Sequence, residues 1–124
     1  MNTQRLAQRA YQSQATPIRT PRGVEYEAFA RITHRMAGAA RQGTRGFAKL
    51  AEALHDNRRL WVTLAAAVAD TDNALPADLR ARLFYLAEFT EAHSRKVLRG
   101  AAPVAPLIEV NTTVMRGLRK EGTA

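Results

Sequence analysis

Residues 47–69, FAKLAEALHDNRRLWVTLAAAVA, decide the fold of this chain. Starting from Phe47, large apolar side chains recur after 3, 4, 7, 3 and 4 residues. This spacing is the period of an amphipathic α-helix, so it predicts one long helix that ends near Ala69. Asp56 is a good N-cap residue, which leaves a kink or restart of the helix at that point open. The apolar positions are Phe47, Leu50, Leu54, Trp61, Leu64 and Val68.

The segments on both sides have the same helical period. A helix is predicted over about 21–41, begun by the Thr20–Pro21 pair and ended by Gly43 and Gly46. A third helix is predicted from Pro76 to just before Gly100, and a shorter one over about 106–118. Their inward positions are Phe29, Ile32, Met36 and Ala40; Leu79, Leu83, Leu86, Thr90, His93 and Val97; and Leu107, Val110 or Asn111, Val114 and Leu118.

The fold class predicted from these patterns is all-α, because no strand pattern competes with the helical period. We expect a small helical bundle of three long helices, a short C-terminal helix and a labile N-terminal helical arm. The 124 residues suit a single domain over 1–124. Within it, residues 1–20 are expected to be a flexible basic arm and linker, 21–118 the bundle, and 119–124 a frayed tail.

Composition excludes several classes of protein. The chain has no cysteine, which excludes a disulfide scaffold and a thiolate metal site. No apolar run approaches the length of a membrane-spanning helix, and the first 20 residues contain no hydrophobic signal region. We therefore expect a cytoplasmic location with no membrane partner.

The sequence contains no recognisable catalytic grouping. His34, His55 and His93 do not form a zinc-binding motif, and GxSxG, Walker A and GxGxxG motifs are missing from the sequence. Asp70 and Asp72 lack the further ligands of a calcium loop and are interpreted as turn residues. We expect no enzyme activity, no cofactor, no metal and no small-molecule substrate.

The positive charge is concentrated in the first third of the chain. The net charge is +8, and residues 1–45 carry eight arginines against two glutamates. This distribution favours an anionic partner such as RNA, while a solvated arginine-rich face is an equally good interpretation. Few aromatic rings are expected at the surface for stacking on bases, namely Tyr11, Tyr26 and Tyr85. The candidate RNA contacts are Arg5, Arg9, Arg19, Arg22, Arg31 and Arg35.

Two polar residues fall on otherwise apolar helix faces. Arg58 lies on the stripe between Leu54 and Trp61, where an unpaired charge is costly. We predict that it pairs with a carboxylate, the alternative being a contact with a ligand at an interface. Asn111 lies on the inward face of the last helix and is expected to hydrogen-bond across the bundle.

An ordered set of short stretches resembles the FlaF family of flagellar regulators from alphaproteobacteria. The resemblance covers nearly the whole chain, and its most diagnostic stretch is NRRLW at 57–61, followed by Leu64. The other matching stretches are AY at 10–11, EYEAF at 25–29, NALP at 73–76 leading into LRA at 79–81, His93 with Val97 and Leu98, LIEVN at 107–111 and MRGL at 115–118.

The resemblance implies a role in making flagella. Members of the family promote flagellin synthesis or secretion, opposite the partner regulator FlbT, and are thought to bind flagellin as a cytoplasmic export chaperone. Flagellin is thus the expected partner, with FlbT as a further one, and direct binding of flagellin messenger RNA through the basic half is the alternative. The residues that we expect to line a partner groove are Arg58, Leu60, Trp61, Leu107, Ile108, Asn111 and Met115. For Trp61, a place in the core is an equally good interpretation.

Overall fold

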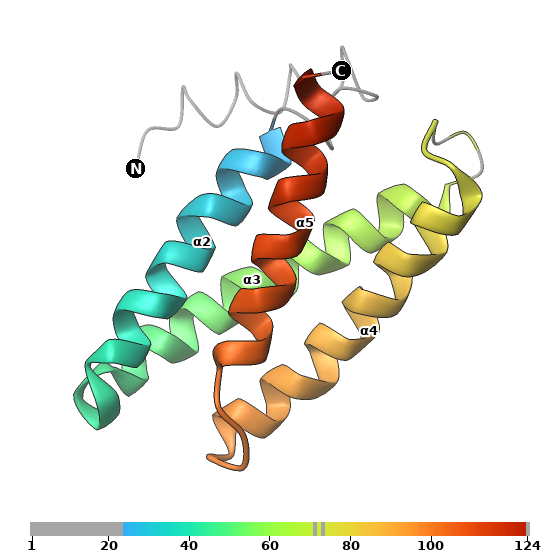
Figure 1. Cartoon of the computed structure of the whole chain (residues 1–124). Helices are drawn as coiled ribbons and strands as arrows, with labels where there is room; N and C mark the ends of the chain where they lie inside the picture. Colours follow the sequence, from blue (N-terminus) through green and yellow to red (C-terminus); the bar gives the residue numbers. More distant parts are fainter. Residues whose placement is uncertain (1–23, 71, 73, 124) are drawn as a thin grey trace, which may run out of the picture.

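The computed structural model describes residues 24–70, 72 and 74–123, and these residues form an all-α bundle with no strand among them (Figure 1). Side-chain surroundings are described for residues 26–70, 72 and 74–117. The elements are α2 (Val24–Arg41), the short 3-10 helix η2 (Gly43–Gly46), α3 (Phe47–Ala69), α4 (Ala77–Leu98) and α5 (Ala105–Thr123).

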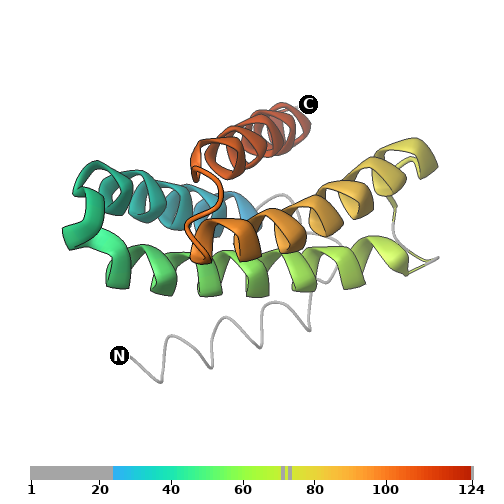
Figure 2. The same ribbon diagram turned by 90° about the horizontal axis from the view of Figure 1, so that it is seen from below.

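Helix α3 packs closely against α2 on one side and α4 on the other. In the view of Figure 2, α5 lies over the gap between α2 and α4, on the side opposite α3. It packs extensively on α2 and only sparsely on α4. The bundle is therefore tight in the pairs α2–α3, α3–α4 and α2–α5 and more open between α4 and α5.

Glycines end the helices where the sequence predicts. Gly43 adopts a φ of 63° after α2, and Gly46 sits so close to α2 that an added Cβ would collide with the Ala39 carbonyl oxygen. After α4, Gly100 adopts a φ of 73° and donates to the Val97 carbonyl at 3.0 Å, while Ala101 donates to the Lys96 carbonyl at 2.8 Å. This pair of hydrogen bonds is the Schellman motif, which confirms the predicted end of the helix.

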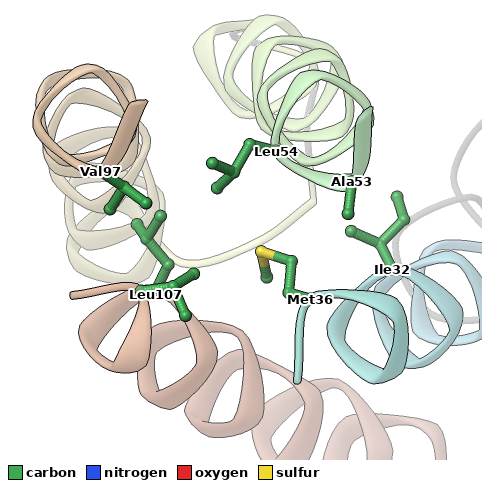
Figure 3. Close-up of a cluster of buried hydrophobic side chains, with 7 residues drawn as sticks. Ile32, Met36, Ala53, Leu54, Val97 and Leu107 are labelled. Atoms are coloured by element: carbon green, nitrogen blue, oxygen red, sulfur yellow. The ribbon is translucent and has the colours of Figure 1, made fainter. Parts of the chain in front are cut away.

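The core consists of two clusters of buried apolar side chains contributed by all four helices. The second cluster, drawn in Figure 3, brings side chains of α2, α3, α4 and α5 together, with Met36 and Leu54 fully buried. The predicted stripe on α3 is confirmed from Leu54 to Val68. The first cluster is Phe29, Trp61, Leu64, Val68, Leu83 and Val114, and the second is Ile32, Met36, Ala53, Leu54, Val97, Val104 and Leu107.

Some details differ from the sequence predictions. α3 runs without a break through Asp56, because the buried side chains on both sides of that position belong to one continuous stripe. Phe47 is the first residue of α3 and is 48% exposed, so its placement in the core was wrong. The C-terminal helix continues to Thr123 rather than ending at 118, and residues 119–121, RKE, are all good helix formers.

Candidate functional site

A buried polar network joins α2, α3 and α5 at the centre of the bundle. The Trp61 indole N–H donates to Asn111 Oδ1 at 2.9 Å. The Asn111 amide nitrogen donates in turn to Asn57 Oδ1 at 2.8 Å and to Thr33 Oγ1 at 3.0 Å. The predicted cross-bundle role of Asn111 is confirmed. Because Asn57, Trp61 and Asn111 are all buried, this network holds the bundle together and is not an open surface.

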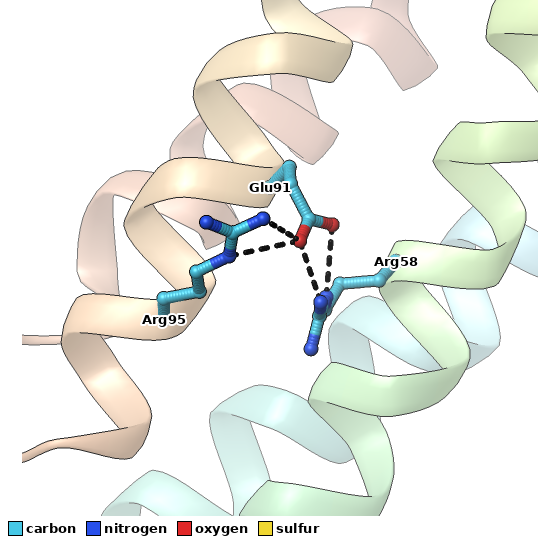
Figure 4. Close-up of polar contacts among 3 residues, drawn as sticks. All are labelled: Arg58, Glu91 and Arg95. Carbon is cyan, nitrogen blue, oxygen red and sulfur yellow. Dashed lines mark hydrogen bonds and ion pairs between the residues drawn. The ribbon is translucent and has the colours of Figure 1, made fainter.

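A charged cluster links α3 to α4 at the surface (Figure 4). Arg58 donates from Nε to Glu91 Oε1 at 3.0 Å and from Nη2 to Glu91 Oε2 at 2.5 Å, which is a bidentate pair. Arg95 donates from Nε to the same Oε2 at 3.1 Å. The predicted carboxylate partner of Arg58 is therefore confirmed, although the pair is half-buried rather than buried.

These hydrogen bonds shift the titration of the paired groups. The bond from Arg58 is the main cause that lowers the pKa of Glu91, assisted by Arg95 and opposed by partial burial. The bond to Glu91 likewise raises the pKa of Arg58 above its ordinary value. Glu91 is thus a carboxylate held between two guanidinium groups.

An open groove of about 540 Å³ runs between α3 and α4, and we call it the α3–α4 groove. Its apolar walls include the exposed side chains of Val62 and Phe84, together with the small side chains of several alanines. The Arg58–Glu91–Arg95 cluster lies at its edge. The lining residues are Arg58, Trp61, Val62, Ala65, Phe84, Ala87, Glu88, Thr90, Glu91, Ala92 and Arg95.

Two large apolar side chains of this groove are exposed to solvent. Val62 is 63% exposed and Phe84 is 44% exposed, and Tyr85 beside it is 65% exposed, as the sequence predicted. The sequence analysis missed the groove itself. Its signal was the run LFYLAEF at 83–89, which contains more apolar residues than one helix face can bury.

Thr90 forms part of the groove lining from the core side of α4. It is 1% exposed, and its hydroxyl has no hydrogen-bond partner among the described residues. Ser94, one turn further along α4, is in the same situation. An unpartnered buried hydroxyl loses its hydration without compensation. The Asn57 amide nitrogen is likewise buried without a partner among the described residues, so the network around Asn111 is connected but not fully satisfied.

A second groove of about 550 Å³ lies between α4 and α5. Its apolar members include Leu86, Phe89 and Val110, all of them half-buried. It carries no exposed large apolar side chain of the kind found at Val62 and Phe84. The α3–α4 groove is therefore the better candidate for a docking surface among the described residues.

The residues that the sequence analysis expected in a partner groove do not form a single surface. Leu107 is fully buried in the core and lines neither groove described above. Trp61 is 1% exposed and belongs to the core, as the second interpretation expected, although it also forms part of the lining of the α3–α4 groove. Helical spacing alone does not separate a core position from a groove position on the same face. The remaining apolar members, Leu60, Ile108 and Met115, are half-buried and pack against the core clusters.

The candidate RNA contacts divide into two groups. Arg31 is exposed, while Arg35 donates to Asp56 at 2.8 Å and is tied to α3. The labile arm, its linker and the other four arginines of the hypothesis lie outside the described residues: Arg5, Arg9, Arg19 and Arg22.

The described residues offer no catalytic or metal-binding grouping. His93 donates from Nε2 to the Pro103 carbonyl at 2.8 Å and stacks on Phe89, which is a structural role. Asp70 accepts a hydrogen bond from the Asp72 backbone at 2.9 Å, as expected of a turn residue. Over residues 24–70, 72 and 74–123, no cluster of three or more His, Asp or Glu is placed to bind a metal. None of the helices described is long and apolar enough to cross a membrane.

Fold and groove together define a small all-helical bundle protein whose architecture does not point to catalysis. Residues 7–118 match the family model of the flagellar protein FlaF. The chain therefore belongs to the FlaF family of flagellar proteins, and the resemblance seen in the sequence is confirmed. No curated protein and no solved structure matches the chain.

Proposed function

We propose that this FlaF-family protein binds flagellin in the cytoplasm as an export chaperone, and that it thereby promotes flagellin synthesis and secretion. The observation that carries the proposal is the α3–α4 groove, where Val62 and Phe84 expose apolar surface beside a charged cluster. Exposed apolar side chains in a groove between two helices suit an amphipathic helix laid with its apolar face inward. Membership of a flagellar family supports flagellin as the source of that helix.

In this mechanism the groove covers an apolar helix face that flagellin subunits need for contacts with one another. While the face is covered, subunits do not polymerise before export. Release of the helix at the export apparatus then returns the protein to the cytoplasm. FlbT is proposed as a further partner of the protein.

Calorimetry with purified flagellin tests the proposal. Phe84→Ser removes a 44% exposed ring from the groove, and Phe47→Ser removes a 48% exposed ring outside it, so the two variants form a matched pair. The wild type and Phe47→Ser are expected to bind equally, whereas Phe84→Ser should bind about tenfold or more weakly, as for an aromatic interface anchor. Failure of the wild type to bind flagellin at tens of micromolar (about −6 kcal/mol) would contradict the proposal.

Binding of flagellin messenger RNA is the second proposal for this protein, supported by the exposed Arg31 and the net charge of +8. A gel shift on the flagellin leader with a salt titration separates it from flagellin binding. Phosphate contacts require an affinity that falls steeply with salt, so a salt-insensitive complex would contradict an RNA mode based on arginine.

A further inference from the structure

The charges along the α3–α4 groove are unequally distributed. Arg58 and Arg95 converge on the single carboxylate of Glu91, so this end keeps an uncompensated positive charge. Neither Nη1 atom of the two arginines has a hydrogen-bond partner among the described residues. Arg95 is 63% exposed at its side chain, which leaves its guanidinium open to a further carboxylate.

Carboxylates lie toward the other end of the groove. Glu88 lines the groove about one turn before Glu91 on α4 and is exposed. Beyond it, three exposed aspartates lie in and after the turn that joins α3 to α4. Two arginines partly offset these carboxylates: Arg80 donates to the Val68 and Leu75 carbonyl oxygens and keeps its charge, and Arg82 is exposed. The aspartates are Asp70, Asp72 and Asp78.

The backbone dipoles of the groove walls do not oppose this gradient. α3 and α4 run antiparallel, so that the C-terminus of one lies near the N-terminus of the other (Figure 1). Their macrodipoles therefore largely cancel at each end of the groove. The side-chain charges decide the electrostatic polarity that a docked helix meets.

From these observations we infer that the α3–α4 groove accepts an amphipathic helix in one direction only. The C-terminal end of that helix, with a carboxylate in its last turn, lies against Arg58 and Arg95, and its N-terminal end lies toward Phe84 and the aspartates near the turn between α3 and α4. A helix carries partial negative charge at its C-terminus and positive charge at its N-terminus, so its dipole and its acidic side chain favour the same direction. The inference rests on the proposed function, because it specifies the segment that the groove would bind.

The length of the groove sets the spacing of the anchors in the ligand. Phe84 and Arg95 are three turns apart on α4, which is about 16 Å along its axis. A ligand helix that lies along α4 therefore places an apolar side chain against Val62 and Phe84 and its carboxylate about three turns later. The alanines of the lining, Ala65, Ala87 and Ala92, let its backbone approach closely.

Two synthetic helical peptides of about 18 residues test the direction directly. Both carry the same leucine stripe; one has glutamates in its last turn and lysines in its first, and the other has these charges exchanged while helicity is held equal by circular dichroism. Wild-type protein is expected to bind the first peptide about tenfold more tightly than the second at low salt, with the preference shrinking as salt is added. Equal binding of the two peptides, or binding of neither, would overturn the inference.

A charge reversal in the protein provides the matched control. Arg95→Glu should abolish or invert the preference between the peptides, whereas Lys96→Glu makes the same charge change on an exposed neighbour that does not line the groove and should leave the preference intact. Thermal unfolding verifies that both variants remain folded. An unchanged preference in a folded Arg95→Glu variant would also overturn the inference.

Flagellin is assayed in parallel so that the two proposals fail separately. If flagellin binds but Arg95→Glu and Phe84→Ser bind it like the wild type, the proposed function stands and the directional groove is wrong. If the peptide preference holds but flagellin does not bind, the groove polarity stands and the proposed function is wrong. Self-association of the chain that Phe84→Ser abolishes would assign the groove to a second copy and overturn the inference.

Discussion

The polar side chains on the two flanks of α3 are hydrogen-bonded in different ways. On the flank toward α2 and α5, Asn111 accepts from Trp61 and donates to Asn57 and Thr33, so one amide connects three helices. On the flank toward α4, the buried hydroxyls of Thr90 and Ser94 have no partner among the described residues, whereas within the connected network the Asn57 amide nitrogen is the atom left without one. The contacts on this flank are completed at the surface by Arg58 and Glu91.

From this difference we expect the two flanks to contribute differently to stability and to binding. A connected polar network fixes the register of the helices that share it, because misalignment would leave buried groups unpaired. A flank with unpaired hydroxyls and an open groove contributes less to stability and keeps apolar surface available for a ligand. We therefore expect substitutions on the α2–α5 flank to act on folding and those at the groove to act on binding.

Asn111→Ala is expected to have the largest effect, because it removes the hub of the network. The Trp61 N–H and the Asn57 oxygen would remain buried without partners, and a cavity would be left. We expect the free energy of unfolding in urea to fall by about 3 kcal/mol. Thr113→Ala, at an exposed position on the same helix, should change it by less than about 0.5 kcal/mol. A loss below about 1 kcal/mol for Asn111→Ala would contradict the structural role of the network.

The same substitution on the two flanks is expected to have opposite signs. Thr90→Val replaces an unpartnered buried hydroxyl with a methyl group and should raise the free energy of unfolding by about 1 kcal/mol. Thr33→Val removes an acceptor of the Asn111 amide and should lower it by about 1 kcal/mol. Equal effects of the two variants in urea unfolding would remove the distinction between the flanks.

Glu91→Gln is expected to have the smallest effect, since the ion pair is about one-third exposed and screened by solvent. We expect a loss below about 1 kcal/mol at pH 7. The pKa of Glu91 is lowered in the folded state, so its stabilisation is complete above the unfolded carboxyl pKa and is lost as the pH falls through the folded value.

Urea unfolding of the wild type and Glu91→Gln across this pH range provides the measurement. The difference between the two proteins should be present at neutral pH and should shrink as the pH falls through the lowered pKa of Glu91. Glu88→Gln is the control, because that exposed carboxylate on the same helix has no ion-pair partner among the described residues. A difference that persists at acid pH would show that the effect of Glu91→Gln is not electrostatic.

Much of the fold was predictable from the sequence because helices are specified locally. The apolar period of α3, the glycine after α4 and the inward position of Asn111 each depend on residues within a few turns of one another. It was also predictable that Arg58 pairs with a carboxylate, since a charge on an apolar stripe requires a partner. The sequence did not reveal that this partner is Glu91, 33 residues away.

The sequence by itself determined the helical class and the family, through the apolar period of its helices and the FlaF signature now matched over 7–118. Tertiary structure decided which apolar residues are buried and which stay exposed. Trp61 and Phe84 both lie on apolar stretches and both line the α3–α4 groove, yet Trp61 is buried and Phe84 remains exposed. The physical reason is that burial depends on what packs across from a side chain: side chains of α2, α4 and α5 join Trp61 in one core cluster, whereas Phe84 lies in an open groove lined by α3 and α4 alone.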